Sequence, residues 1–519
     1  MSENIILIGF MGAGKDTIGR YLAQQLQKSF ISTDAMIELV EGQTVAEIFE
    51  KKGEAYFRKR EALVLQTIKN LKNTVIATGG GMVLFEQNRD ILKNMGRVVQ
   101  LHAELSTLKK RISFNGTRPL IKSAEDLETL YNKRRGLYDF TEIYVDTTER
   151  SVKEIAQEII EKLKLKVLNN FNKSYKMTVR TKMAQYPIVI GADIISQLDI
   201  KSKGRIKVLV ITNPLVGALY LFELKHSLEK NGHIVFVKII PDGERYKNIK
   251  TVNSIYKVLL GHKFSREDLI IGLGGGVITD IAGFVASTYK RGMRLINVPT
   301  TLLAMVDAGF GGKTGVNTKF GKNMVGTFYQ PEMVICDIKT LLNLSDYEFK
   351  NGIAEIIKYG LIASGKLIRI LQRDKEQILG RRLDVLFRMI KESILIKTSV
   401  ITQDEKETEG KREILNFGHT IGHIIETFTK YKKYSHGEAI AMGMIEEIRM
   451  FGKESDLDIN LIIDLLKNYG LPFILPKMIE KDYIKELLLQ DKKIRADTIK
   501  IPVLARIGRA KIKNLKLGG

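Results

Sequence analysis

Two separate catalytic signatures follow one another along this chain of 519 residues. Residues 9–17, GFMGAGKDT, contain a phosphate-binding loop. A second set of motifs extends over residues 242–493 and includes GLGGGVITD at 272–280, GIAEIIKYG at 352–360 and LNFGHTIGH at 415–423. Because a domain typically has roughly 150 residues, a chain of this length has room for several domains. We therefore expect two enzymes on one polypeptide.

A formal net charge of +23 raises the question of nucleic acid binding. Lysine and arginine are, however, scattered along predicted helix faces, and no basic motif interleaved with aromatic residues occurs. We therefore expect no nucleic acid partner. Small polyanionic substrates also suit a basic protein, and we expect those instead.

The sequence also argues against a membrane protein. No apolar run approaches about 18 residues, so no membrane span is expected. Met1 leads almost directly into an apolar strand, so no leader is expected either. Cys336 is the single cysteine, which excludes a disulfide framework and fits a reducing cytoplasm.

Alternating secondary structure sets the expected domain order. Strand-like and helix-like segments alternate through residues 1–165, which predicts a parallel sheet with helices on both faces. Residues 166–176 are polar, rich in asparagine and aperiodic, and are expected to form a linker. The alternation returns in residues 177–340, which predicts a Rossmann-like α/β domain, and residues 341–519 are expected to be mainly α-helical.

The first motif has the residues and the setting of a nucleotide site. Gly9, Gly14 and Lys15 form a Gly-x4-Gly-Lys pattern that follows a strand and opens a helix. The glycines allow backbone N–H groups to close around phosphate oxygens, and the helix N-terminus adds the positive end of its dipole. Lys15 supplies a charge for the β- and γ-phosphates. This setting predicts a triphosphate site rather than a simple glycine turn.

Further motifs narrow the function of this half. The loop is followed, in order and spacing, by FISTD at 30–34, GQTVAEIFEKKGEAYFR at 42–58, ATGGG at 77–81, RPLI at 118–121 and KRRGLY at 133–138. With these motifs, residues 1–165 resemble the shikimate kinase family along their whole length. The resemblance implies an α/β P-loop kinase domain that uses ATP with Mg²⁺.

The same resemblance implies roles for single residues. Asp34 would contact the shikimate hydroxyls and help to deprotonate the attacking one. Arg58 and Arg134 would hold the substrate carboxylate, and Gly80 would let the backbone approach the ring. The implied catalytic residues are Lys15, Asp34 and Arg118, the last entering from a lid. The implied ATP-binding residues are Gly12, Ala13, Gly14, Lys15, Asp16, Thr17, Arg111 and Arg118.

Two positions depart from the pattern of this family. The residue after the loop lysine is usually a Ser or Thr that binds Mg²⁺, but here it is Asp16. The position two before Asp34 usually carries an Asp, but here it is Ser32. Our hypothesis is an exchange in which Asp16 binds Mg²⁺ directly, so that the site keeps its carboxylate. The rival interpretation is an inactive or regulatory P-loop appendage.

The second set of motifs contains a candidate metal site. Three of the seven histidines, His419, His423 and His436, lie within eighteen residues, and the first two share a helix face. Glu355 lies on an apolar helix, an expensive place for a carboxylate without a partner. Two histidines and a glutamate form a catalytic type of zinc site with an open position. Spacing alone does not decide which two histidines bind.

The motifs of the second half again point to one family. They are VPTTLLAMVDAGFGGKTGVN at 298–317, GKNMVGTFYQP at 321–331, GIAEIIKYG at 352–360, LNFGHTIGH at 415–423, HGEAIAMGM at 436–444 and DKK at 491–493. The chain from about residue 180 to its end resembles the 3-dehydroquinate synthase family. The resemblance implies cyclisation of 3-deoxy-arabino-heptulosonate 7-phosphate to 3-dehydroquinate with loss of phosphate. It also implies catalytic NAD⁺ that is not consumed, and Zn²⁺ or a similar divalent metal.

By this resemblance, Glu355, His419 and His436 would bind the metal, whereas His423 would contact the substrate phosphate and move protons. The implied NAD-binding residues are Asp242, Glu244, Lys247, Gly275, Gly276, Asp280, Thr300, Thr301, Asp307, Lys313 and Lys322. The implied substrate-binding residues are Arg291, Lys313, Asn323, Lys358, Lys397, Arg412, Asn416, His423 and Lys492 or Lys493, with Lys313 and His423 also catalytic. The family further implies a homodimer formed through this half.

The two implied reactions belong to one pathway, but they are not consecutive. We therefore expect independent sites joined by a tether. An alternative makes the second half a related sugar-phosphate cyclase or a metal-dependent polyol dehydrogenase. Lys397 and Arg412 argue against the alternative, because a substrate without a carboxylate needs no such pair.

Overall fold

The chain forms two compact units in a computed structural model that describes residues 3–113, 119–121, 123–141, 143–165, 171–452, 458–476, 479 and 498–516. The first unit comprises Met1–Asn170, Thr212–Ser227 and Ile239–Asp242. The second comprises Phe171–Ile211, Leu228–Lys238 and Gly243–Gly519.

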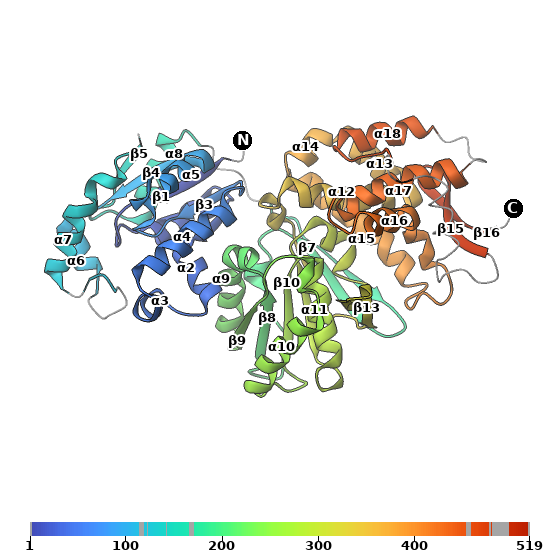
Figure 1. The fold of residues 1–519 in the computed structure, drawn as a ribbon, viewed down its shortest axis with the longest axis horizontal. Coiled ribbons are helices and arrows are strands. Elements are labelled where there is room, and N and C mark those ends of the chain that lie inside the picture. Colours follow the sequence, from blue (N-terminus) through green and yellow to red (C-terminus); the bar gives the residue numbers. More distant parts are fainter. Residues whose placement is uncertain are drawn as a thin grey trace. The chain divides into compact units, whose positions relative to one another are not determined.

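The first unit is built on a five-stranded parallel sheet (Figure 1). The strands, in spatial order, are β2 (Ser29–Ser32), β3 (Thr74–Ala77), β1 (Asn4–Ile8), β4 (Gly96–His102) and β5 (Ile143–Asp146). Alternate residues of β1 enter different cores, since Ile6 and Ile8 pack in one cluster and Ile5 and Leu7 in another. Both faces of this sheet are therefore buried, as expected for a parallel sheet covered by helices.

The helices of this unit are α1 (Lys15–Gln25), α2 (Thr33–Glu41), α3 (Val45–Lys52), α4 (Glu54–Ile68), α5 (Glu86–Met95), α6 (Leu105–Arg111), α7 (Ala124–Arg134) and α8 (Val152–Lys162). Three of them begin with a capping box, in which Thr44, Ser123 or Ser151 exchanges hydrogen bonds with an acid three residues later. Each capping box therefore fixes the residue at which its helix begins.

The second unit contains a seven-stranded sheet. Its strands, in spatial order, are β6 (Tyr175–Arg180), β7 (Gln185–Gly191), β14 (Met333–Asp337), β11 (Arg294–Pro299), β10 (Leu269–Gly274), β8 (Lys207–Thr212) and β9 (Ile234–Ile239). Strand β6 runs antiparallel to β7, whereas the pairs from β7 through β14, β11 and β10 to β8 are parallel. The unit also has α10 (Ile249–Gly261), α11 (Gly276–Thr288) and the hairpin β12 (Lys313–Thr318) and β13 (Gly321–Phe328), whereas most residues of α9 (Pro214–Lys230) fall in the first unit.

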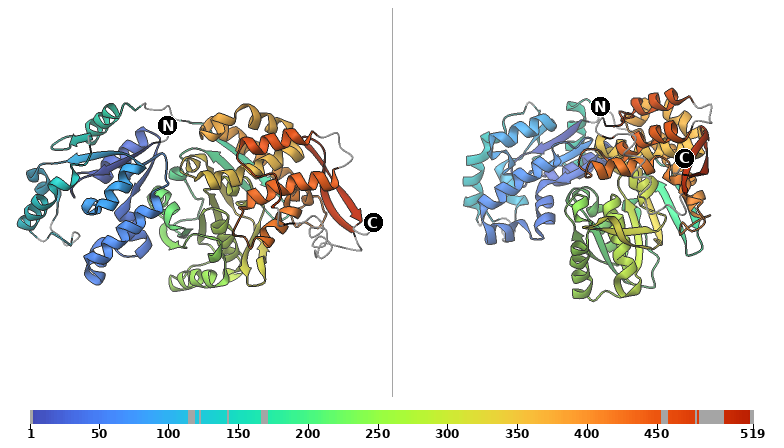
Figure 2. Two further views of the ribbon diagram at one scale, coloured as in Figure 1. Left: turned by 45° about the horizontal axis from the view of Figure 1, so that its top comes forward. Right: turned by 45° about the vertical axis from the view of Figure 1, so that its right-hand side comes forward.

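A helical part follows the sheet, drawn in ochre to red in Figures 1 and 2. Its helices are α12 (Asp346–Ala363), α13 (Gly365–Arg373), α14 (Lys375–Leu379), α15 (Leu383–Ile401), α16 (His419–Phe428), α17 (His436–Phe451) and α18 (Ile459–Asn468). Helix α12 lies in the main core, where Ile353, Ile356 and Ile357 are fully buried. Among the described helices, none is long and apolar enough to cross a membrane.

The predicted fold class is confirmed, with two differences in detail. The strand β6 begins at Tyr175, inside the stretch expected to be a linker, of which residues 166–170 lie outside the described part. The chain also ends in an antiparallel hairpin, β15 (Thr498–Arg506) and β16 (Arg509–Lys516), where helices were expected. In this hairpin residues 501–504, IPVL, are all buried, a short apolar run that lies between lysine-rich segments.

Two leucines on α4 test this packing. Leu65 is fully buried in the core of the first unit, whereas Leu63 is 54% exposed. We expect Leu65→Ala to lower the free energy of unfolding by about 2–5 kcal/mol, because the cavity cannot fully collapse. The matched control Leu63→Ala should change it by less than about 0.5 kcal/mol. Urea denaturation of the full chain, followed by far-UV circular dichroism, measures both, and equal effects would contradict the assigned core.

Candidate active sites

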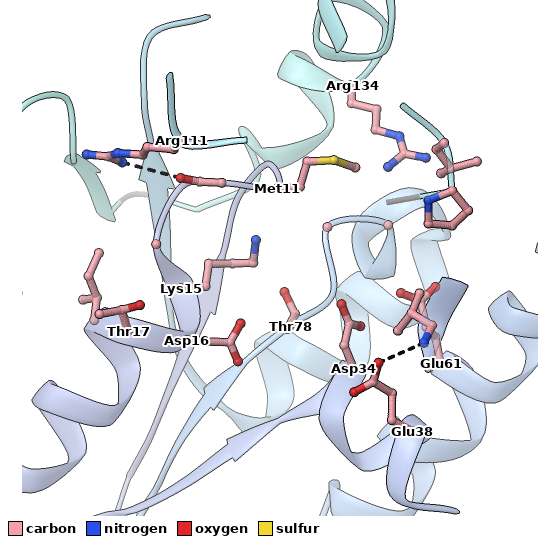
Figure 3. A pocket seen from close by; sticks show the side chains of 18 of the residues that line it. Met11, Lys15, Asp16, Thr17, Asp34, Glu38, Glu61, Thr78, Arg111 and Arg134 are labelled. Atoms are coloured by element: carbon pink, nitrogen blue, oxygen red, sulfur yellow. Dashed lines mark hydrogen bonds between the residues drawn. The ribbon is translucent and has the colours of Figure 1, made fainter. Parts of the chain in front are cut away.

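The phosphate-binding loop of the first unit connects β1 to α1, as Figure 3 shows. Gly12 and Gly14 have φ values of +81° and +88°, which only glycine adopts without strain. The loop therefore turns directly into the N-terminus of α1. The buried Lys15 ammonium donates to the carbonyls of Gly9 and Phe10, at 2.9 and 3.0 Å. This contact places a positive charge over the loop.

A cavity of about 620 Å³ opens beside this loop. The predicted residues that line it are Gly12, Gly14, Lys15, Asp16, Thr17, Asp34, Arg58, Gly80, Arg111 and Arg134. Figure 3 shows Lys15, Asp16, Thr78 and Asp34 around one hollow. Ala13 is fully buried in the loop, and Arg118 lies outside the described residues. The structure thus brings the two ends of the predicted site, loop and arginines, into one cavity.

Asp34 is the acid at the centre of this cavity. Burial raises its pKa to about 7, the nearby carboxylate of Glu61 adds to the rise, and the ammonium of Lys15 opposes it. Its Oδ1 atom has no hydrogen-bond partner. A Cβ on Gly79 would lie 2.2 Å from that oxygen, so the chain leaves room for this carboxylate only with glycine there. Near neutral pH, such a group can accept a proton.

Two carboxylates hold the arginine end of the cavity. Arg58 Nη1 donates to Glu61 at 2.7 Å, and Nη2 donates to Glu54 at 2.6 Å. Arg134 lies 3.9 Å from Glu54. Sequence reasoning did not single out Glu61, although it is only 1% exposed. Glu61 could have been predicted from the sequence, because an acid three residues after Arg58 on a helix lies on the same helix face as Arg58.

The two departures from the family pattern have different surroundings. Asp16 lies in the first turn of α1 and lines the cavity. Ser32 is instead the N-cap of α2, where its hydroxyl accepts from the amide of Ala35 at 3.5 Å. Arg111, expected near the nucleotide, donates to the Gly12 carbonyl of the loop at 3.5 Å and to the Thr147 carbonyl at 2.6 Å.

In the second unit, Glu355, His419 and His436 come together. One ligand atom from each residue lies within 4.8 Å of the others. Glu355 comes from the middle of α12, whereas the histidines are the first residues of α16 and α17. His419 Nε2 and His436 Nε2 lie 3.3 and 3.6 Å from the same Glu355 oxygen. His423 lies beside this group, with its ring 5.5 Å from that of His419.

The donors of this group fit a divalent metal. Glu355 is fully buried, and neither of its carboxylate oxygens has a hydrogen bond of good geometry, although Lys358 approaches one oxygen to 2.5 Å. Burial alone would raise the pKa of Glu355, but Lys358 and His419 outweigh it and keep the carboxylate ionised. An ionised carboxylate beside two imidazoles is the donor set that zinc takes in catalytic sites.

Glu426 is a further acid at this site. His436 Nδ1 lies 3.5 Å from Glu426, on the side of the ring away from Glu355. Burial would lower the pKa of His436, but Glu355 and Glu426 together raise it to about 9. A second carboxylate that orients a ligand histidine is common in metal sites. Glu426 follows His419 by seven residues, a helical spacing that could have marked it in the sequence.

Several of the predicted dinucleotide residues follow the carboxyl ends of β9, β10 and β11, and ligands of parallel sheets bind at such ends. Gly275 and Gly276 form the turn from β10 to α11. The other members lie after β9 (Asp242, Glu244, Lys247), on α11 (Asp280), after β11 (Thr300, Thr301, Asp307) and on the hairpin (Lys313, Lys322).

Contacts join several of these residues. Lys247 forms an ion pair with Asp280 and donates a hydrogen bond to Asn323 at 2.6 Å. Asn323, a predicted substrate-binding residue, therefore contacts a predicted NAD-binding residue. A Cβ on Gly275 would approach Thr301 to 3.1 Å, which shows how closely the two segments pack.

The predicted carboxylate-binding lysine is buried beside Asp307. Lys397 lies 2.6 Å from Asp307, and the hydroxyl of Tyr359 donates to the same carboxylate at 2.8 Å. Burial lowers the pKa of Lys397 to about 8, against the opposing effect of Asp307. Asp307 was assigned to the NAD set, so the structure links that set to the substrate set through Lys397.

Two other predicted cations share one acid. Lys313 lies 2.5 Å and Arg412 lies 3.4 Å from the same oxygen of Glu407. Asn416 ends the short 3-10 turn that Arg412 begins. Arg291 does not join this group, because it lies exposed in the turn before β11, at the opposite end of that strand from Thr300. Lys492 and Lys493 lie outside the described residues.

Comparison with known proteins supports the resemblance of each half to its family. The shikimate kinase family profile matches residues 11–164. The profiles described as 3-dehydroquinate synthase N-terminal and C-terminal match residues 237–351 and 352–494.

Individual relatives cover most of the second half. The 3-dehydroquinate synthase of Thermodesulfovibrio yellowstonii is 44% identical over 316 residues, which are 60% of this chain and 88% of the relative. That of Geotalea uraniireducens is 41% identical over 325 residues, 62% of this chain and 90% of the relative. A solved structure of ValA (2-epi-5-epi-valiolone synthase) from Streptomyces hygroscopicus subsp. jinggangensis, with NAD⁺ and Zn²⁺ bound, shares the fold.

The likeness to ValA has a TM-score of 0.59 at 24% identity and covers 65% of this chain and 94% of that one. At that identity it supports the fold alone. The family profiles and the curated relatives carry the assignment: the chain belongs to the 3-dehydroquinate synthase family and carries a shikimate kinase domain ahead of its synthase domains.

Proposed function

We propose that the first unit transfers the γ-phosphoryl group of ATP to shikimate and forms shikimate 3-phosphate. The observation that carries this proposal is the single cavity that joins Lys15 and Asp34 to Arg58 and Arg134. It provides a phosphate end, a base and a carboxylate end, which are the three requirements of this transfer.

In this mechanism, the N-terminus of α1 and Lys15 bind the triphosphate, and Arg58 and Arg134 bind the shikimate carboxylate. The shikimate hydroxyl oxygen attacks the γ-phosphorus, the bond from that phosphorus to ADP breaks, and Asp34 accepts the hydroxyl proton. Glu61 keeps the Arg58 guanidinium in place. Asp16, in the first turn of α1, would be the direct ligand of Mg²⁺.

We propose that the second unit converts 3-deoxy-arabino-heptulosonate 7-phosphate into 3-dehydroquinate. The observation that carries this proposal is the group of Glu355, His419 and His436, in which Lys358 contacts the buried Glu355 carboxylate. The same unit also buries the cations Lys397 and Arg412. When bound there, NAD⁺ would reversibly accept a hydride from a substrate hydroxyl, and a divalent ion would polarise that hydroxyl.

The residues of the chain would position this substrate. Glu355, His419 and His436 would hold the ion, and Lys397 and Arg412 would bind the substrate carboxylate. Lys313 and Arg412 contact Glu407, so a substrate anion would have to replace that carboxylate before it could bind there. His423, beside the metal ligands, would move protons at the phosphate end.

A related sugar-phosphate cyclase is the second candidate, because ValA shares the fold. The 44% identity to a 3-dehydroquinate synthase favours the first candidate over a relative at 24%. We further propose that the substrates are small molecules alone, that the chain forms a homodimer through its second unit, and that it works in the cytoplasm. The single cysteine, Cys336, is a buried free thiol, as a reducing compartment allows.

The pKa of Asp34 predicts the pH dependence of the kinase. Because burial raises that pKa to about 7, kcat/KM for shikimate should rise as the pH increases through about 7, when the base form appears. Asp34→Asn should lower kcat by at least about 100-fold, since a positioned base is lost. Shikimate-dependent ADP formation measures both, and synthase turnover of the same variant is the internal control. A flat profile from acid to alkaline pH would contradict the assigned base.

The same shift predicts a change in stability. A carboxyl whose folded pKa exceeds its unfolded pKa loses stabilising free energy as the pH rises through the folded value, here about 7. Asp34→Asn should therefore raise the urea midpoint of the full chain above that of the wild type at alkaline pH, and less so at acid pH.

The exchanged metal site predicts the behaviour of paired variants. If Asp16 is a Mg²⁺ ligand in place of the usual hydroxyl, Asp16→Ser and Ser32→Asp should each reduce kinase turnover more than the double variant does. Aspartate is also a good N-cap, so Ser32→Asp leaves the start of α2 intact. The measurement is shikimate-dependent ADP formation over a Mg²⁺ titration. An inert wild type that the double change activates would instead show a decayed kinase.

The metal site predicts a selective loss. Glu355→Gln should lower zinc affinity at least about tenfold and abolish synthase turnover, because it removes the buried anionic ligand. Kinase turnover of the same protein should not change. The measurements are bound zinc per chain and phosphate release from the heptulosonate phosphate, with no net NADH in the wild type. Accumulating NADH with a polyol would favour a dehydrogenase instead.

A further inference from the structure

Two of the three proposed metal ligands stand at helix ends. His419 is the first residue of α16, and His436 is the first residue of α17. A side chain at the first position of a helix moves with that end of the helix. Whatever fixes these two N-termini therefore fixes two of the three ligands.

The N-terminus of α17 is capped from within its own sequence. Ser435 and Glu438 form a capping box there, and the Gly437 amide also donates to Asn351 of α12. This helix start is the ordinary solution for the amides that have no partner inside the helix.

The N-terminus of α16 has no cap of its own. Its N-cap residue is Gly418, which has a φ of +79° and no side chain to accept a hydrogen bond. The carboxylate of Glu447, which comes from α17, takes this place. It accepts from the amides of Gly418 at 2.7 Å and Ile421 at 3.3 Å. A side chain from a neighbouring helix thus does the work of a cap.

The packing of the two helices makes this contact possible. A Cβ on Gly443 of α17 would lie 2.1 Å from the Gly418 carbonyl, and one on Gly418 would lie 2.5 Å from Met444. The two backbones therefore touch at this level. Glu447 follows Gly443 by four residues, so it projects from the same face of α17 toward the start of α16.

The burial of Glu447 is unfavourable unless its carboxyl group is hydrogen-bonded, which points to a structural role for its contacts. The residue is only 2% exposed, and burial raises its pKa to about 8, against the opposing effect of the Gly418 and Ile421 amides. A buried carboxyl group is expensive unless it is hydrogen-bonded, and so are buried helix-end amides. Here each satisfies the other.

We propose that Glu447 is a positioning residue of the synthase metal site: by capping α16 it holds His419 where His419 and Glu355 share one ion. The inference rests on the proposed metal site and extends it to a residue that contacts none of the reacting groups. Outer residues that orient metal ligands typically change metal affinity by about 10–100-fold when replaced.

The neighbouring Glu446 supplies a matched control. It lies on the same helix and is also 2% exposed, but it pairs with Arg449 of α17 rather than with α16. The test compares Glu447→Met, which keeps the volume and loses the acceptor, with Glu447→Gln, which keeps an acceptor oxygen, and with Glu446→Met. Zinc affinity of each full chain is measured by competition with a chromophoric chelator.

We expect Glu447→Met to bind zinc at least about tenfold more weakly than the wild type, and Glu447→Gln to recover most of the affinity. Glu446→Met should bind as the wild type does. In the zinc-free chains, the amides of residues 418–421 should exchange hydrogen faster in Glu447→Met than in Glu446→Met. If Glu447→Met does not fold, Glu447→Asp replaces it, because its shorter side chain draws the carboxylate back from the Gly418 amide.

Wild-type affinity in Glu447→Met, or an equal loss in Glu446→Met, would overturn the inference. A wild-type chain that binds no zinc would refute the metal site itself, and the inference with it. The two failures are therefore distinguishable by the wild-type measurement alone.

Discussion

A fully buried carboxylate, Glu355, is the constraint on which the second unit depends. It lies in the middle of an apolar helix, where an isolated charge is unfavourable. Three groups compensate this charge: Lys358 of the same helix, and two histidines that approach the carboxylate from the N-termini of two other helices. The arrangement of α12, α16 and α17 is thus largely a means of bringing compensating groups to one point.

The first unit also contains a buried carboxyl group with a nearby cation. Asp34 is buried among other acids, and its charge is tolerated only because the loop holds Lys15 nearby. In both units, a carboxyl group whose burial disfavours its charge is one to which the chemistry is assigned.

The sequence pointed to residues that the structure brings together in both candidate sites, for a physical reason. Motif residues such as Lys15, Asp34, Glu355 and His419 are the ones proposed to carry the chemistry, so the resemblance to known families pointed to them directly. Because strands alternate with helices, the sheet layers were also predictable. The grouping of His436 rather than His423 with Glu355 could not come from spacing, since it depends on where α17 begins.

Supporting residues were much harder to predict. Glu61, Glu426 and Glu447 each act through a contact with a predicted residue or with the helix that carries it, and two of these contacts join different helices, α16 and α17. Arg291 is a different case, since the resemblance implied it but it precedes β11 while Thr300 follows that strand. A sequence pattern identifies types of residues, whereas the contacts that support them are properties of the packed chain.

The contact between Gly443 and Gly418 has a consequence for how the proposed metal site would take up an ion. Because the two backbones touch there, α16 can neither slide along α17 nor rotate against it without a collision. The positions of the proposed ligands are therefore set by the packing of the protein before an ion binds. An ion that prefers a different geometry would have to bind to ligands held in these positions.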